Sequence, residues 1–272
     1  MFRKLLKHEF LATRGLLGTL TCAALLLSIP GGAVLRLLIN LIQNEQANDT
    51  MQSLGIIGLF FSLFFIMLAL VAYTLGVQIY LYWRCYKHKF TDEGYLTFTL
   101  PVTCTQIYLS SYISILLWTL ISGLVVLLSM NLIALIGAGE YILEQETLGE
   151  IGVVLEQMLT AYDQIAEPIL LCTAAILTVL SSPAIPMVCI TLGAVLAKKH
   201  KILMAFVMYY AITTVLSFIQ SVLTVFLGLV LDSDPILYFN LSTLLPCALS
   251  AGLAVGGSVL SIWLTRHKLN LP

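Results

Sequence analysis

The chain contains six long apolar stretches, and five of them carry no aspartate, glutamate, lysine, arginine or histidine. These stretches are 16–42, 54–83, 107–138, 168–197, 202–231 and 242–265. A helix that crosses the hydrocarbon layer of a membrane needs about 20 mostly apolar residues, and every stretch meets that length. The sequence therefore predicts an all-α integral membrane protein with six transmembrane helices.

The composition excludes other classes of protein. Of the 272 residues, 60% are hydrophobic and 10% are charged, whereas soluble proteins are about one quarter charged. A secreted disulfide-stabilised scaffold, a nucleic-acid binder and a disordered tail are all incompatible with these values. The expected surroundings are a lipid membrane, and no nucleic-acid partner is expected.

The distribution of basic residues predicts the orientation, because cytoplasmic loops of membrane proteins carry an excess of lysine and arginine. If the N-terminus is cytoplasmic, every lysine and arginine except Arg36 falls on the cytoplasmic side. Eleven of the fourteen acidic residues then fall outside. We therefore expect both termini in the cytoplasm, including the tail 266–272.

The first residues, 1–15, have the pattern of an amphipathic helix that lies along the inner leaflet. Apolar side chains occupy one helical face and basic side chains the other: Phe2, Leu5, Leu6 and Phe10 against Arg3, Lys4, Lys7 and His8. A frayed basic tail is the alternative. The remainder, 16–265, is expected to form one transmembrane domain.

Two further local signals concern the helices themselves. Thr103 and Gln106 have the spacing of a capping box, in which the two side chains bind each other's backbone amides at a helix start. The prolines within the spans are expected to kink their helices, because proline removes a backbone hydrogen bond. They are Pro30, followed by two glycines, and Pro183, Pro186 and Pro246.

The spans contain few side chains that could bind an ion or take part in catalysis. Ion-driven carriers need titratable or coordinating groups near the membrane midplane, and the strongest polar side chains in the spans are Gln78, Asn131 and Gln220. These three could contact a substrate, although hydrogen bonding between helices is the favoured interpretation. No catalytic group or metal site is predicted, so we do not expect an enzyme.

The chain also lacks a nucleotide-binding loop, which requires a glycine followed by lysine and serine or threonine. No Gly-Lys dipeptide occurs in the sequence. If the protein moves a compound against its gradient, the energy must come from a separate chain. Such a partner would dock on the largest cytoplasmic loop, 84–106, where Asp92 and Glu93 precede an aromatic-rich run. An ordinary solvated turn fits this pattern equally well.

Three strings carry a resemblance to a known family: MFRKLLKHEF at the start, FTDEGYLTFTLPVT at 90–103, and TRHKLNL at 265–271. They resemble membrane permease subunits of ABC transporters, of the ABC-2 exporter family common in Gram-positive bacteria. The resemblance implies that loop 84–106 forms a coupling helix seated in an ATPase subunit, and that the turn 198–201 makes a second contact. The coupling residues would be Asp92, Glu93, Gly94, Tyr95, Leu96, Phe98, Lys198 and Lys199.

The same resemblance implies partners and a location. The partners would be an ABC ATPase, which binds ATP and magnesium, and a second copy of the chain or a related permease. The location would be the bacterial cytoplasmic membrane. The apolar character of the spans suggests a lipophilic or amphipathic cargo, such as a drug, antimicrobial peptide or lipid. A sensor or scaffold that binds an ATPase without transport, and an ATP-independent facilitator, are the alternatives.

Two segments have patterns that indicate a contact with a second copy of the chain or with other parts of the same chain. Segment 139–167 is acidic and has apolar residues at alternating steps of three and four, which predicts an extracellular amphipathic helix. We expect it to cover the outer mouth, to lie on the outer leaflet or to pair with a second copy. In the last span, Ala248, Gly252 and Gly256 lie on one face, which indicates either a dimer interface or packing within the chain.

Overall fold

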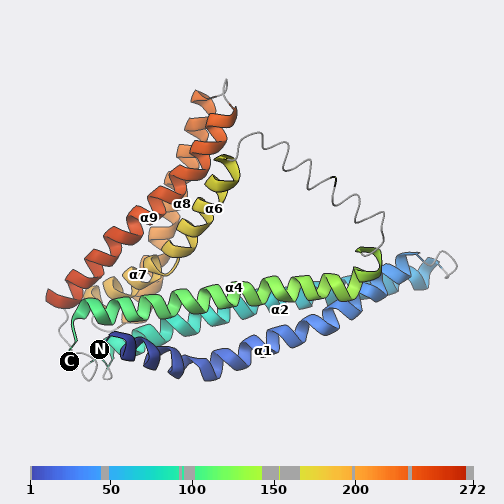
Figure 1. Ribbon diagram of the computed structural model, residues 1–272, viewed down its shortest axis with the longest axis horizontal. Helices are drawn as coiled ribbons and strands as arrows, with labels where there is room; N and C mark the ends of the chain where they lie inside the picture. Colours follow the sequence, from blue (N-terminus) through green and yellow to red (C-terminus); the bar gives the residue numbers. More distant parts are fainter. Residues whose placement is uncertain are drawn as a thin grey trace. The chain divides into compact units, whose positions relative to one another are not determined.

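A computed structural model of the chain describes residues 2–43, 49–91, 94, 102–142, 153, 166–197, 200–231 and 235–267. Nearly all of these residues are helical, and no strand occurs in these ranges. The helices, in chain order (Figure 1), are α1 (Phe2–Gln43), α2 (Asp49–Phe90), α4 (Cys104–Ile142), α6 (Ala166–Ser181), α7 (Ala184–Leu196), α8 (Lys201–Val230) and α9 (Pro235–His267).

Six helical segments are long and apolar enough to cross a membrane, with α6 and α7 together forming the fourth. The all-α fold with six spans is therefore confirmed. Large apolar side chains lie exposed along these helices, for example Phe206 at 71% and Leu229 at 78%. Because water contact costs about 25 cal/mol for each Å² of apolar surface, this surface fits a lipid environment.

Several helices extend beyond the predicted spans. Helix α2 continues through 84–90, where the sequence analysis predicted a loop. Lysine and arginine have good helix propensity, so the basic residues of 84–90 are compatible with a helix. Helix α9 begins at Pro235 rather than at 242, since proline is well accommodated in the first turn of a helix. Helix α1 runs from Phe2 to Gln43 without interruption, so the expected amphipathic segment 1–15 and the expected first span share one helix.

The fourth span is two helices rather than one. Its break lies at Ser182 and Pro183, between α6 and α7. Pro183 has no amide hydrogen, so the carbonyl of Val179 loses its helical donor. The Ser182 hydroxyl donates to that carbonyl instead, at 2.9 Å. The sequence predicted a kink here, and the second proline at Pro186 lies in the first turn of α7, where it is tolerated.

The chain divides into two compact units, and the division passes through α1, α2 and α4. The three-helix unit comprises Leu11–Ile79 and Trp118–Asp163. Its helices approach closely: a Cβ built at Gly32 of α1 would lie 2.5 Å from the Cβ of Ile136 in α4. The indole of Trp118 donates to the hydroxyl of Thr13 at 2.8 Å and joins the same two helices.

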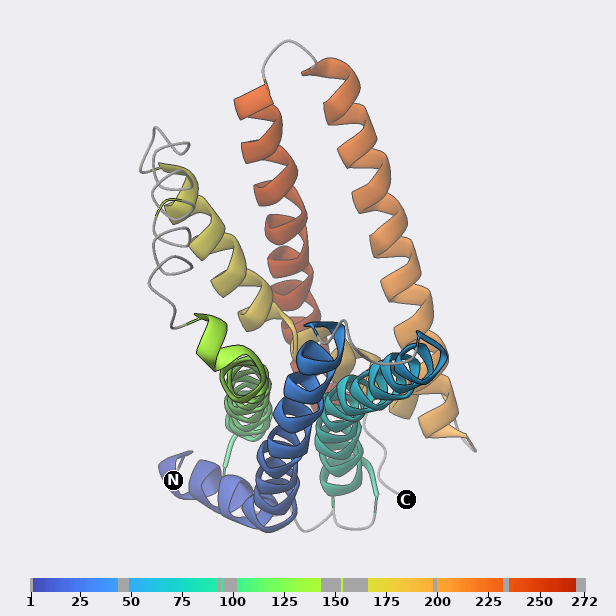
Figure 2. The ribbon, with the colours of Figure 1, turned by 90° about the vertical axis from the view of Figure 1, so that its right-hand side faces the viewer.

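The larger unit comprises Met1–Phe10, Tyr80–Leu117 and Gln164–Pro272. Helix α7 packs against both α8 and α9, and α6 packs against α9. Figure 2 shows α8 and α9 rising side by side with α6 next to α9. The contact between α7 and α8 requires a glycine, because a Cβ at Gly193 would lie 2.6 Å from the backbone nitrogen of Ala205.

Candidate functional site

Polar side chains from four helices of the larger unit are linked near the ends of these helices. The hydroxyl of Ser111, in the first turns of α4, donates to a carboxylate oxygen of Glu9 in α1 at 2.8 Å. Three residues earlier, the Tyr108 hydroxyl donates to Ser258 of α9 at 3.2 Å. One turn further along α9, Ser261 shares a hydrogen bond of 2.9 Å with Thr191 of α7. These bonds tie α1, α4, α9 and α7 together.

Lys89, near the end of α2, adds a positive charge to this group. Its side chain is only 4% exposed, and its Nζ lies 5.3 Å from the centroid of the Tyr108 ring. No described nitrogen or oxygen atom is in hydrogen-bond geometry with the Nζ, whereas the thiol of Cys85 is close enough to interact with it. The charges of Lys89 and Glu9 both act on the thiol of Cys85, so the two charges lie in one neighbourhood. We name Glu9, Lys89, Tyr108, Ser111, Thr191, Ser258 and Ser261 the basal network.

An apolar cluster lies beside the basal network and fixes the end of α2. Phe90 of α2 packs with Ile190 of α7 and Ala205 of α8, all three buried, and the rings of Tyr82 and Tyr86 pack against them. The rings of Tyr86 and Phe90 have centroids 6.1 Å apart. The residue before loop 91–103 is therefore anchored to α7 and α8.

The other end of the loop is fixed by the predicted capping box. The amide of Gln106 donates to the Thr103 hydroxyl, and the amide of Thr103 donates to the Gln106 side chain, each at 3.4 Å. These reciprocal bonds confirm the capping box and start α4 at Cys104. The basal network begins one turn later, at Tyr108, so the residues that flank segment 91–103 on both sides lead directly into it.

The predicted coupling residues fall mostly in parts of the chain that are not described. Asp92, Glu93, Tyr95, Leu96, Phe98, Lys198 and Lys199 lie outside the described residues, as does most of segment 139–167. Gly94 is described and buried, and its amide donates to the carbonyl of Thr91 at 2.7 Å. The coupling role of this set stays a prediction.

The predicted pathway residues are engaged in hydrogen bonds with helices. Gln78 of α2 donates to Thr119 of α4 at 3.1 Å, and Gln220 of α8 donates to the carbonyl of Pro246 in α9 at 3.4 Å. Asn131 is exposed and donates to a carbonyl of its own helix, that of Leu127, at 2.8 Å. The bonds of Gln78 and Gln220 agree with the interhelical interpretation. Gln78 and Asn131 belong to the three-helix unit, and Gln220 belongs to the larger unit.

The predicted dimer residues do not pack against described neighbours. Ala248, Gly252 and Gly256 are exposed on α9, and nothing described lies within 4 Å of a Cβ built at either glycine. Packing within the chain uses the adjacent Gly257, where a Cβ would lie 2.6 Å from Val188 of α7. Of the two interpretations, packing within the chain therefore applies to Gly257 and not to the predicted face.

Sequence reasoning missed the basal network, although one signal pointed to Lys89. The buried positions of α2 recur every three or four residues, at Tyr73, Val77, Leu81 and Cys85, and the next step lands on Lys89. Lys89 lies within 84–106, which the sequence predicts as a cytoplasmic loop.

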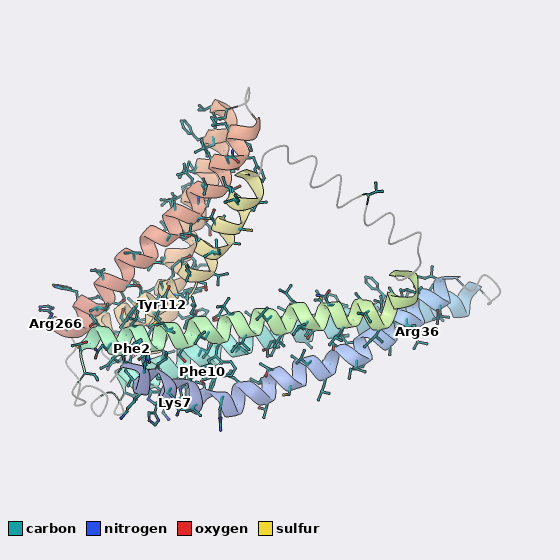
Figure 3. The ribbon with its side chains drawn as sticks, viewed as in Figure 1. Phe2, Lys7, Phe10, Arg36, Tyr112 and Arg266 are labelled. Carbon is teal, nitrogen blue, oxygen red and sulfur yellow. The ribbon has the colours of Figure 1, made fainter. Side chains whose placement is uncertain are left out.

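A second contact that the sequence did not predict joins α4 to the fourth span. The Tyr112 hydroxyl donates to the carbonyl of Leu180, next to the break between α6 and α7 (Figure 3).

The described residues contain no group of three histidine, cysteine, aspartate or glutamate side chains that could hold a metal ion. No protein-family model, no curated protein and no solved structure matches the chain.

Proposed function

We propose that this chain is the membrane subunit of an ATP-driven exporter of the ABC type, with the basal network on its cytoplasmic side. One observation carries the proposal: the residues on both sides of segment 91–103 are anchored in the same group of helices. Phe90 holds one end against α7 and α8, and Tyr108 links the other to α9. A force applied to this loop would therefore reach several membrane helices at once.

The energy source follows from what the sequence lacks. Without a nucleotide-binding loop, the chain would depend on a separate ATPase subunit that binds ATP and magnesium. Asp92 and Glu93 would meet this subunit first, and Lys198 and Lys199 would make a smaller second contact. Two permease chains, either identical or related, would enclose the pathway between them.

The expected cargo is lipophilic or amphipathic. Titratable side chains are absent from five of the six predicted spans, and the substrates of ion-coupled carriers usually meet such groups near the midplane. A pathway lined by apolar side chains, hydroxyls and amides suits a compound that partitions into lipid. The cargo class rests on this chemistry and on the family resemblance.

The test begins with purification of the full chain in mild detergent and identification of the chains that remain bound. We expect a nucleotide hydrolase among them. Both subunits, reconstituted in vesicles, should then move an amphipathic dye in one direction only when ATP is supplied. The chain alone should move none. Retention of the hydrolase without any directional transport would favour a sensor or scaffold, and transport by the chain alone would favour a facilitator.

A charge-reversal pair tests the docking site. Asp92→Lys together with Glu93→Lys should abolish binding of the hydrolase, because the acidic pair becomes basic. Glu146→Lys together with Glu150→Lys is the matched control, since it reverses two acids in the segment predicted on the other side of the membrane. Equal binding of the hydrolase by both double variants would place the docking surface elsewhere.

A further inference from the structure

Two exposed tryptophans of the larger unit lie one to two turns before the C-terminal ends of α2 and α9. Trp83 of α2 is 51% exposed, with the Nζ of Lys87 5.8 Å from its ring centroid. Trp263 of α9 is 49% exposed, and the ring of His267 stacks on it with centroids 5.2 Å apart. Tryptophan is enriched where lipid headgroups meet the hydrocarbon layer. In both pairs the polar residue lies one turn closer to the helix end.

Basic side chains of the larger unit lie in the first turns of α1 and near the end of α2. Arg3, Lys4 and Lys7 on α1 are exposed, as is Lys87 on α2, and Arg84 is half-buried beside it. We name these five residues the basic collar. Figure 3 shows Lys7 on the side of α1 away from the other helices. The described acid nearest in sequence to these α1 residues, Glu9, is half-buried and accepts a hydrogen bond from Ser111.

The first ten residues of α1 also have an apolar face. Phe2, Leu5, Leu6 and Phe10 are half-buried, whereas Arg3, Lys4, Lys7 and His8 are exposed. This arrangement agrees with the amphipathic pattern that the sequence predicted. A helix of this kind at an interface places its basic face among headgroups and its apolar face among acyl chains.

We propose that the basic collar binds anionic phospholipids of the inner leaflet by their headgroup phosphates. Several lysines and arginines next to a membrane helix attract acidic lipids, and each contributes about fivefold to binding. An acidic lipid also matches the exposed ring of Trp83, because one molecule supplies both a negative headgroup and an acyl chain. An acidic protein surface would match the charge alone.

The test uses the full chain without any ATPase, so its result does not depend on the proposed transport activity. The chain is purified in mild detergent with equal amounts of phosphatidylglycerol and phosphatidylcholine, and native mass spectrometry measures the ratio of the lipids retained. We expect phosphatidylglycerol to be preferred. The variant with Arg3→Gln, Lys4→Gln and Lys7→Gln should reduce that preference by up to about 100-fold, at about fivefold for each charge.

Two control variants accompany this measurement. Lys4→Arg together with Lys7→Arg keeps the charge and should retain the preference, which separates loss of charge from loss of folding. Arg36→Gln removes one positive charge from the same helix in the other unit and should change the ratio little. A second readout locates the lipid in a Trp263→Phe background, where Trp83 is exposed and the remaining Trp118 is buried. Brominated phosphatidylglycerol should quench the tryptophan fluorescence more strongly than brominated phosphatidylcholine, by acting on Trp83.

Either of two results would overturn the proposal. The first is equal retention of the two lipids by the unsubstituted chain. The second is a preference for phosphatidylglycerol that survives neutralisation of Arg3, Lys4 and Lys7. If the neutralised variant instead loses a bound protein while its lipid ratio is unchanged, the basic collar serves an acidic protein surface.

Discussion

Replacing Lys89 by methionine should make the protein more stable, because Lys89 is a buried charge without a described hydrogen-bond partner. Removing an ammonium group from water costs several kcal/mol even after the protein relaxes. Two attractions oppose this cost. The contact with the Tyr108 ring, at 5.3 Å, contributes about 1–2 kcal/mol. The second is the negative charge of Glu9, which acts on the same Cys85 thiol as the charge of Lys89 does.

Methionine keeps the apolar stem of Lys89 and its packing, so the net gain on Lys89→Met should be about 1–3 kcal/mol. Unfolding in mixed micelles of mild detergent and dodecyl sulfate, followed by tryptophan fluorescence, measures it as a higher midpoint. Lys7→Met is the control: Lys7 is exposed, so the free energy of unfolding should change by less than about 0.5 kcal/mol.

The result that would refute this reasoning is a loss of about 1 kcal/mol or more on Lys89→Met. Such a loss would mean that the ammonium group is stabilised by the thiol of Cys85 or by a partner beyond the described residues. If the basal network transmits force from loop 91–103, Lys89→Met should also lower ATP-dependent transport while the ATPase subunit stays bound. A gain in stability together with unchanged transport would restrict Lys89 to a structural role.

The remaining predictions concern close packing, the helix break and the helix cap. Gly193→Ala should lower the free energy of unfolding by about 1–3 kcal/mol, because its Cβ would lie 2.6 Å from the backbone of Ala205. Gly252→Ala is the control, measured in the same micelle assay. Because the space around Gly252 is open, this variant should be neutral or slightly stabilising. Ser182→Ala should cost about 1 kcal/mol by the same assay, because it removes the donor to a freed carbonyl. Thr103→Ala should cost about 0.5–1 kcal/mol and increase hydrogen exchange in the first turn of α4. Equal effects at the two glycines, or no change in exchange at α4, would contradict the packing and capping arguments.

The sequence predicts the six spans reliably because the membrane imposes one demand on them, a long apolar run. It predicts the capping box for a similar reason, since the two residues involved are only three positions apart. It does not predict whether a proline bends a helix or ends it. Pro30 lies inside the continuous α1, whereas Pro183 ends α6, and Ser182 and Tyr112 supply donors to the carbonyls freed there. Tyr112 comes from a distant part of the chain.

The candidate site was harder to predict, because its bonds join residues far apart in sequence. Glu9 and Ser111, or Tyr108 and Ser258, have no common local pattern. A small-residue motif is easy to find in the sequence because its pattern is local. Which neighbour it faces depends on the packing of the whole chain, so the sequence does not predict its contact. The repeat at Gly252 and Gly256 faces outward from the described neighbours, and the next residue, Gly257, makes the close contact.

The discontinuity between α6 and α7 has a mechanical meaning. In an unbroken span, tilting one half against the other would strain a ladder of backbone bonds that lipid cannot replace. Here the ladder is already interrupted, and a phenol from α4 holds one of the loose carbonyls. Releasing that phenol would break a single hydrogen bond, so tilting the two halves of the fourth span would disturb fewer backbone hydrogen bonds here than within α6 or α7.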